Sequence, residues 1–313
     1  MATNVALYIH IPFCLQKCSY CSFVSYTGRL QDAERYVQTV INEISKRAGG
    51  HKVKSIYFGG GTPSLIPTSL LERLMENLKD YYLQGDAIEV SLEVNPGTVN
   101  EEYLKAIKSY GINRLSIGVQ SLDSKELGRL GRLHDASAAV KVMESARSAG
   151  FDNINIDLIY GIPGQSLRSW RRTLEGVVSM EPEHLSLYGL SLEPGTAMLS
   201  QIESGKLPQI NPDLSADQYE MAEKMLEKQG YRHYEISNWA KPGYECRHNL
   251  AYWRHEEYIG AGVSACSYLD NHRFANCADL DEYMVSFESG AFVEKEGDEV
   301  IDRELASAEA AIL

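Results

Sequence analysis

The sequence lacks the features that mark secreted, membrane-spanning and nucleic-acid-binding proteins. It has 30 Lys and Arg against 43 Asp and Glu, a formal net charge of −13, which argues against a broad surface for nucleic acid or anionic lipid. No stretch approaches the run of about 18 apolar residues that a membrane span needs. The N-terminus also shows no basic segment followed by a long apolar one. We therefore expect a cytoplasmic protein with no nucleic-acid partner and no membrane span, although peripheral membrane contact stays open.

Cysteine is scarce, and half of it is concentrated in one place. Of six cysteines, three are scattered and three lie together as Cys14, Cys18 and Cys21. This is too few for a disulfide scaffold and fits a reducing compartment. The C-x3-C-x2-C spacing follows an apolar strand predicted at residues 5–11. Three thiols on one short loop therefore predict a metal or iron-sulfur centre.

The number of ligands favours an iron-sulfur cluster over zinc. Structural zinc takes four protein ligands, and this loop supplies three, with His10 on the preceding strand at an uncertain angle. A cubane cluster held by three cysteines keeps one iron open. Buried free cysteines are the alternative, but the polar residues between the thiols do not favour it. The loop resembles the signature of the radical S-adenosylmethionine (SAM) superfamily, in which SAM chelates the open iron of a 4Fe-4S cluster.

Strand-like and helix-like segments alternate along residues 1–192. The predicted strands are residues 5–11, 55–58, 88–94, 114–119, 153–160 and 184–190, and the predicted helices are residues 32–48, 69–82, 100–110, 135–149 and 166–180. Such repeats predict an α/β fold with a parallel sheet, whose sites form at the carboxyl ends of the strands. Six units predict an open, three-quarter (β/α)6 TIM-like barrel, which is also the architecture that the resemblance implies.

The alternation weakens after residue 192. Proline and glycine punctuate a loop-rich stretch, and a helix is predicted at 215–229 and a strand at 231–239. We interpret residues 193–303 as a smaller α+β extension that closes the open side of the barrel. Residues 304–313 form a helix-like run without a C-terminal cap. We interpret this run as the start of a truncated C-terminal domain.

Polar and glycine-rich residues follow several of the predicted strands. Residues 59–63 read Gly-Gly-Gly-Thr-Pro, which lets the backbone approach a ligand closely but lacks the lysine of a phosphate-binding loop. Glu93, Gln120, Arg132 and Asp157 supply carboxylates, an amide and a guanidinium. These groups complement the ribose diol, ammonium and carboxylate of SAM, although each alone is also a candidate for a structural ion pair.

These stretches together resemble the oxygen-independent coproporphyrinogen III oxidase-like branch of the superfamily, over nearly the whole chain. In that branch the cysteines hold the cluster, and the following positions of this sequence match SAM contacts: Tyr8, Tyr20, Gly60, Gly61, Thr62, Glu93, Gln120, Arg132 and Asp157. The oxidase has a further cysteine where this chain has Phe23, and a longer N-terminal arm. Both departures, and the H-N-x-x-Y-W pattern that begins at His248, resemble the HemW-like haem chaperones.

The HemW-like resemblance implies a protein that binds a 4Fe-4S cluster, SAM and haem, and delivers haem to haem-dependent respiratory proteins. His248 is then the candidate axial ligand of the haem cargo, and no catalytic residue is assigned. If residues 246–253 are helical, His248 and Tyr252 share one face. Two enzyme readings remain open: a coproporphyrinogen III oxidase-like enzyme of porphyrin metabolism and a radical SAM methyltransferase. A non-catalytic iron-sulfur module is a third reading.

Overall fold

The computed structural model describes residues 4–81, 88–288 and 296–312, and it confirms the predicted α/β fold. Its central parallel strands are β1 (Asn4–Ile11), β4 (Lys52–Gly60), β5 (Glu89–Val94), β6 (Arg114–Gln120), β7 (Ile154–Tyr160) and β8 (His184–Gly189). The helices between them are α1 (Ala33–Arg47), α2 (Thr68–Leu78), α3 (Glu101–Ser109), α4 (Ser124–Leu130), α5 (Ala136–Ser148) and α6 (Leu167–Val178).

Local sequence accounts for these elements. Helix α1 buries Tyr36, Val37, Val40 and Ile44, which recur every three to four residues, against the sheet. Strand β6 is buried along its whole length, as expected for a parallel strand covered on both faces. Strand β4 is longer than predicted, because its pairing with β1 runs from Lys52 to Gly60 through half-buried positions that the apolar pattern does not mark.

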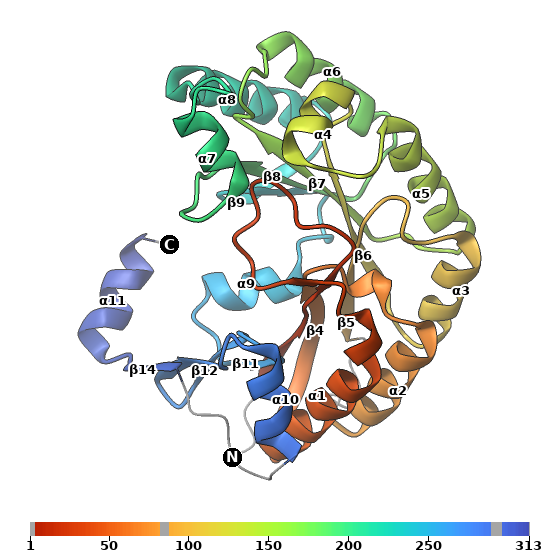
Figure 1. Cartoon of the computed structure of the whole chain (residues 1–313), viewed down its shortest axis with the longest axis vertical. Helices are drawn as coiled ribbons and strands as arrows, with labels where there is room; N and C mark the ends of the chain where they lie inside the picture. Colours follow the sequence, from red (N-terminus) through yellow and green to blue (C-terminus); the bar gives the residue numbers. More distant parts are fainter. Residues whose placement is uncertain (1–3, 82–87, 289–295, 313) are drawn as a thin grey trace.

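The sheet is continuous but does not close. Its strand order is β14-β13-β12-β11-β1-β4-β5-β6-β7-β8-β10-β9, so β14 and β9 are edges rather than partners of each other. Figure 1 shows the curved sheet with α1, α2, α3, α5, α6 and α8 arranged in an arc around its outer face. The predicted partial barrel is therefore confirmed.

The later part of the chain extends this sheet at both ends. Its strands are β9 (Arg232–Glu235), β10 (Asn238–Ala240), β11 (Tyr258–Ala261), β12 (Cys266–Leu269), β13 (His272–Ala275) and β14 (Glu296–Val300). Strand β10 pairs antiparallel with β8, whereas β11 pairs in parallel with β1. The strand predicted at 231–239 is thus a hairpin of β9 and β10. Strands from before and after residue 192 belong to the same sheet. The domain boundary expected at residue 192 stays a prediction.

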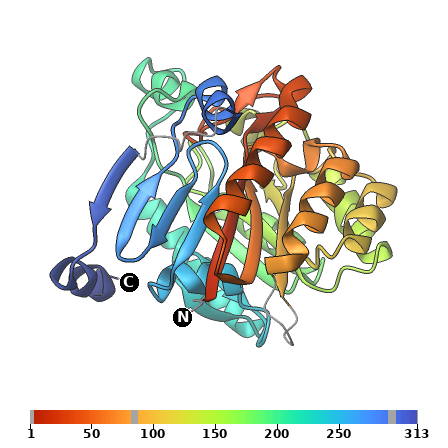
Figure 2. The same cartoon turned by 90° about the horizontal axis from the view of Figure 1, so that it is seen from below.

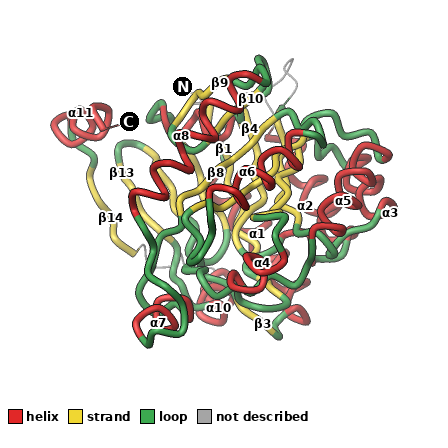
Figure 3. Tube along the Cα trace, turned by 90° about the horizontal axis from the view of Figure 1, so that it is seen from above, coloured by secondary structure: helices red, strands yellow, loops and turns green. Residues whose placement is uncertain are grey.

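The remaining helices are α7 (Ala197–Glu203), α8 (Pro212–Lys228), α9 (Arg247–Trp253), α10 (Leu280–Glu288) and α11 (Arg303–Ile312). Helix α9 lies inside the arc of the sheet (Figure 1), while β14 and α11 stand at one edge of the molecule (Figure 2). Short strands β2 (Phe13–Cys14) and β3 (Tyr26–Thr27) flank the cysteine loop. Helices α7 and α10 lie with β3 at one end of the molecule, and the N-terminus lies at the other (Figure 3).

The largest apolar cluster lies between the sheet and its outer helices, and includes Phe58, Leu92, Leu115 and Trp170. The interior face of the sheet is polar instead, and carries Ser91, Ser116, Asn155 and His184. The site described below is built on this inner face. Within the described residues, no helix combines the length and apolar character needed to cross a bilayer.

Candidate functional site

The three clustered cysteines lie on one loop that is tied to its surroundings by backbone hydrogen bonds. Cys14 ends β2, and the N–H of Cys21 donates to the carbonyl of Cys18 at 3.2 Å. Ser19, between them, donates its N–H to Leu130 O at 3.0 Å and its hydroxyl to Arg129 O at 2.6 Å. The N–H of Met198 donates to Ser19 O at 2.7 Å. The loop is therefore held between α4 and α7.

All three thiols are free and partly exposed. Among the described residues, no three His, Cys, Asp or Glu side chains are arranged to hold a single metal ion. An iron-sulfur cluster makes a different demand, since each thiolate binds its own iron and the sulfurs stay apart. Free thiols at the mouth of one pocket fit such a cluster.

The pocket, of about 430 Å³, opens at the carboxyl ends of the parallel strands. The predicted residues that line it are Cys14, Cys18, Tyr20, Cys21, Gly60, Gly61, Thr62, Glu93, Gln120, Arg132 and Asp157. The fold thus brings together every predicted cluster and SAM residue except Tyr8. His248, the predicted haem ligand, also lies outside the lining.

The glycine loop lies directly against the start of the cysteine loop. Gly60 has φ +112°, and a Cβ there would lie 2.5 Å from the His10 ring. A Cβ on Gly61 would lie 2.8 Å from the carbonyl oxygen of Phe13 and 3.1 Å from the sulfur of Cys14. No side chain fits at either position. These glycines therefore let the glycine loop pack directly against the cysteine loop, and Gly60, Gly61 and Cys14 all line the pocket.

Arg132 brings a positive charge to the cysteine loop. One guanidinium nitrogen donates to Gly118 O at 2.7 Å and to the Asn95 side-chain oxygen, and another lies 3.6 Å from Cys18 Sγ. Asn95 in turn donates to Thr62 Oγ1 at 2.9 Å. The guanidinium is thus oriented by two strand ends. A fixed cation therefore lies beside the sulfur of one of the three clustered cysteines.

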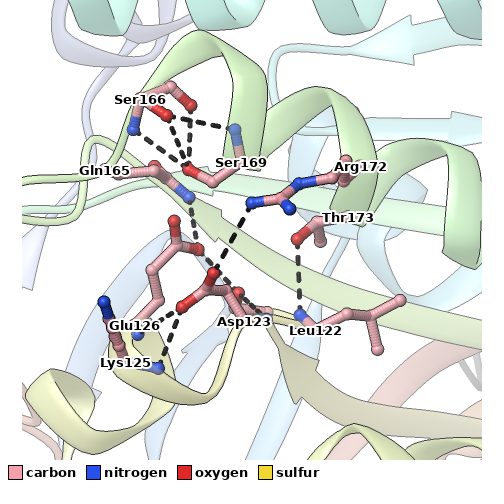
Figure 4. A network of polar contacts seen from close by, with 10 residues as sticks. Leu122, Asp123, Lys125, Glu126, Gln165, Ser166, Ser169, Arg172 and Thr173 are labelled. Carbon is pink, nitrogen blue, oxygen red and sulfur yellow. Dashed lines mark hydrogen bonds and ion pairs between the residues drawn. The ribbon is translucent and has the colours of Figure 1, made fainter.

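A polar network surrounds the start of helix α4, which lies between Gln120 and Arg132 in the sequence (Figure 4). Asp123 caps α4 by accepting from the N–H groups of Lys125 and Glu126 at 2.9 and 3.3 Å. The Glu126 carboxylate accepts from Ser121 Oγ at 2.6 Å and from Gln165 Nε2 at 3.0 Å. These bonds join helix α4 to the segment at the start of α6. Helix α4 ends at Gly131, which has a left-handed backbone conformation, and Arg132 follows directly, so the placement of α4 sets the placement of Arg132.

Two carboxylates face each other across the pocket. Glu93 Oε2 accepts from Gly60 N–H at 3.2 Å. Withdrawal from bulk water, and then the nearby charge of Asp157, raise the pKa of Glu93 to about 8. The pKa of Asp157 is also raised by burial, against the opposing effect of hydrogen bonds from Asn155 and Ser116. Glu93 therefore carries a proton near neutral pH until a cationic group displaces it.

Tyr8 lies behind the glycine loop rather than in the pocket. The His10 ring donates from Nε2 to Val24 O, 2.8 Å away, because only a protonated nitrogen can bond to a carbonyl oxygen. Its Nδ1 is then the acceptor for the Tyr8 hydroxyl at 3.2 Å. His10, whose orientation the sequence left uncertain, thus holds the end of the cysteine loop at Val24.

His248 lies on α9, which is helical as expected, and its side chain is only 1% exposed. Both ring nitrogens have partners: Nδ1 is 3.2 Å from Ser55 Oγ, and Nε2 is 2.9 Å from the Tyr252 hydroxyl. Burial, and then the charges of Arg114 and Lys54, lower its pKa to about 3. The imidazole is therefore neutral, and Tyr252 occupies the nitrogen that faces outward.

Comparison with known proteins places the chain in a family. Residues 8–177 match the family model described as the radical SAM superfamily. The chain is 37% identical over 292 residues to "Heme chaperone HemW" of Synechocystis, covering 91% of this chain and 71% of that protein. It is 36% identical over 302 residues to "Heme chaperone HemW" of Bacillus subtilis, covering 95% and 79%. The chain belongs to the HemW-like family of radical SAM proteins.

A solved structure resembles this HemW-like chain over almost its whole length. It is titled "Coproporphyrinogen III oxidase (HemN) from Escherichia coli is a Radical SAM enzyme", and it matches with a TM-score of 0.85 and 28% identity. The match covers 99% of this chain and 75% of the oxidase chain. The HemW-like fold is thus shared with a radical SAM enzyme of known structure.

Sequence reasoning missed part of this HemW-like site. Tyr57, Asn95, Ser116 and Tyr188 also line the pocket. Tyr57 and Ser116 were detectable in principle, because alternate positions on parallel strands of a barrel face its interior. Asn95 follows Glu93 by two positions at the same strand end. The contact of Glu126 with Gln165 had no local signal, because the two residues are 39 positions apart in the sequence.

Proposed function

We propose that this chain is a radical SAM haem chaperone that binds a 4Fe-4S cluster, SAM and haem, and delivers haem to haem-dependent respiratory proteins. The observation that carries the proposal is the identity of 36 to 39% to proteins named "Heme chaperone HemW" over most of the chain. The geometry of the pocket supports the cofactor part of it.

In this proposal Cys14, Cys18 and Cys21 ligate the cluster, and the fourth iron is left for SAM. When bound, the reduced cluster and SAM together supply one-electron chemistry at the sulfonium. The chain's own residues orient the ligand. Gly60 and Gly61 line the pocket without side chains, and Arg132 provides a positive charge beside Cys18. Glu93 releases a proton when an ammonium group binds, because the ammonium favours the ionised carboxylate.

His248 is the proposed axial ligand of haem. A neutral imidazole is the form that ligates iron, and the low pKa of His248 keeps it neutral. Because its Nε2 is bonded to Tyr252 and its side chain is buried, coordination requires the Tyr252 hydroxyl to release Nε2 and α9 to shift. The proposal therefore includes a rearrangement of α9 on haem binding.

A coproporphyrinogen III oxidase-like enzyme is the second candidate, favoured by the fold shared with the Escherichia coli oxidase. Two measurements on the anaerobically reconstituted chain separate the candidates. The chaperone reading predicts saturable haem binding and transfer of haem to an apo-haemoprotein, with no porphyrinogen product from coproporphyrinogen III and SAM. Decarboxylated product, or a parent chain that binds no haem, would overturn the chaperone reading. Placement in the cytoplasm is part of the same proposal.

A further inference from the structure

A line of hydrogen bonds crosses the barrel interior from the pocket to the far edge of the sheet. Asn155 Nδ2 donates to Asp157 Oδ1 at 2.7 Å, and Asn155 Oδ1 lies 2.6 Å from His184 Nδ1. His184 Nε2 lies 2.7 Å from the hydroxyl of Tyr234, which is on strand β9. Four side chains thus connect the carboxylate in the pocket to the later part of the chain.

The direction of each bond in this line is determined. A carboxylate accepts only, so the amide nitrogen of Asn155 must face Asp157 and its oxygen must face His184. His184 therefore carries its proton on Nδ1, and its Nε2 accepts from the Tyr234 hydroxyl. Burial, and then the charge of Arg114, hold the pKa of His184 well below its usual range. The imidazole is thus neutral and restricted to one tautomer.

Strand register places these groups. Asn155 on β7 is paired directly with His184 on β8, and Ser116 on β6 is paired with Asn155. Ser116 Oγ accepts from Asn155 Nδ2 at 2.7 Å and donates to Asp157 Oδ2 at 3.0 Å. Both carboxylate oxygens of Asp157 are therefore held by donors on central strands. Ser186 Oγ also donates to Asn155 Oδ1 at 3.1 Å, so His184 and Ser186 together hold the amide that orients the carboxylate.

We propose that His184 is a positioning residue of the SAM site: it fixes the amide of Asn155, and through it the carboxylate of Asp157. His184 does not line the pocket, and it acts only through Asn155. The Asn155 oxygen requires the proton on Nδ1 of His184, and the Tyr234 hydroxyl donates to the Nε2 that this leaves unprotonated. The inference rests on the proposed function, in which Asp157 contacts SAM.

Two substitutions of His184 separate positioning from packing. Asparagine places an amide near the position of Nδ1, whereas glutamine places it near Nε2. His184→Asn should keep the donor to Asn155 and bind SAM within about threefold of the parent. His184→Gln loses that donor, and its SAM affinity should fall roughly tenfold, the order expected when one hydrogen bond to a charged group is misplaced. SAM titration of cluster-loaded protein by calorimetry measures both.

A double-mutant cycle measures whether the effects of two substitutions on SAM affinity are coupled, and general structural damage would not produce such coupling. In an Asp157→Asn background, His184→Gln should no longer change SAM affinity, because the group it orients is altered; independent structural damage would add instead. If Asp157→Asn alone leaves SAM affinity unchanged, the proposed SAM site fails. If Asp157→Asn weakens binding but His184→Asn and His184→Gln bind SAM equally, the site stands and the positioning role is wrong.

Tyr234→Phe carries the test if His184→Gln does not fold. It removes one hydroxyl and should weaken SAM binding about threefold, because the His184 ring then loses the bond at Nε2 that helps to hold it against Asn155. Tyr231→Phe is the matched control, since its hydroxyl donates to Pro182 O at 2.6 Å, outside this line of bonds. Equal SAM affinities for the two variants would overturn the proposal.

Discussion

The barrel interior has two polar regions that differ in what their polar atoms face. At the rim, Glu93, Arg132 and the three cysteines line an open pocket. At the floor, His184 and His248 have both ring nitrogens bonded to other protein groups. Polar groups that face a pocket have bonding capacity left for a ligand, whereas groups that face each other stabilise the fold. This difference is the reason to propose the rim as the ligand site and the floor as its structural support.

The largest expected effect concerns the cysteines of the rim. Replacing Cys14, Cys18 or Cys21 with alanine removes one of the three proposed thiolate ligands, and should abolish the broad iron-sulfur absorbance of the anaerobically reconstituted protein. Cys266→Ala is the control, because this thiol is exposed and distant in sequence from the loop. Iron analysis checks both. A triple alanine variant that keeps four irons per chain would show that the cluster is held elsewhere.

The next largest effect concerns Asp157. Its replacement by alanine removes an acceptor that faces the pocket, and should weaken SAM binding by about 1.5 to 3 kcal/mol, roughly ten- to a hundredfold. The cluster absorbance should persist, because Asp157 is not a ligand. Asp152→Ala, an exposed carboxylate that precedes the same strand, is the control. An affinity equal to that of the control would remove Asp157 from the SAM site.

Glu93 should make SAM binding depend on pH. Its pKa of about 8 means that the carboxylate is mostly protonated at neutral pH. If an ammonium binds the ionised form, affinity should rise with pH by up to about tenfold per unit below pH 8, and then level off. Tyr57, Asp157 and the Gly60 N–H also face this group.

Glu93→Gln isolates the contribution of this carboxylate, since the ligand's own amine titrates equally in both proteins. The variant should show a flatter pH profile for SAM affinity. The same raised pKa predicts that the ligand-free protein loses stability as pH rises from the usual carboxyl range through about 8, because the folded state binds the extra proton. Identical slopes for parent and variant, in both affinity and thermal unfolding, would contradict this assignment.

The sequence predicted the rim better than the floor for a physical reason. The rim residues follow strand ends, so local motifs such as the cysteine spacing and the three glycines mark them without knowledge of tertiary contacts. The floor depends on register between distant strands, as in the contact of Ser55 with His248. The continuation of the sheet by β10 and β11 was missed for the same reason, since strand pairing across the chain has no local signal.

The smallest expected effect concerns haem binding at the floor of the barrel. Tyr252 is 36% exposed and covers the buried His248, and its ring packs edge-on against Tyr258. Tyr252→Phe keeps this packing but removes the hydroxyl that occupies Nε2 of His248. If haem coordination must first break that bond, haem should bind about two- to tenfold more tightly to the variant, because a hydrogen bond of about 0.5 to 1.5 kcal/mol is no longer lost. Tyr258→Phe, which removes a neighbouring hydroxyl without freeing His248, should bind haem as the parent does.

His248→Ala should weaken haem binding and shift the Soret band while leaving the iron-sulfur spectrum unchanged. Haem titrations that superimpose for the parent, His248→Ala and Tyr252→Phe would exclude His248 as the ligand, and would leave it as a residue that only stabilises the barrel floor.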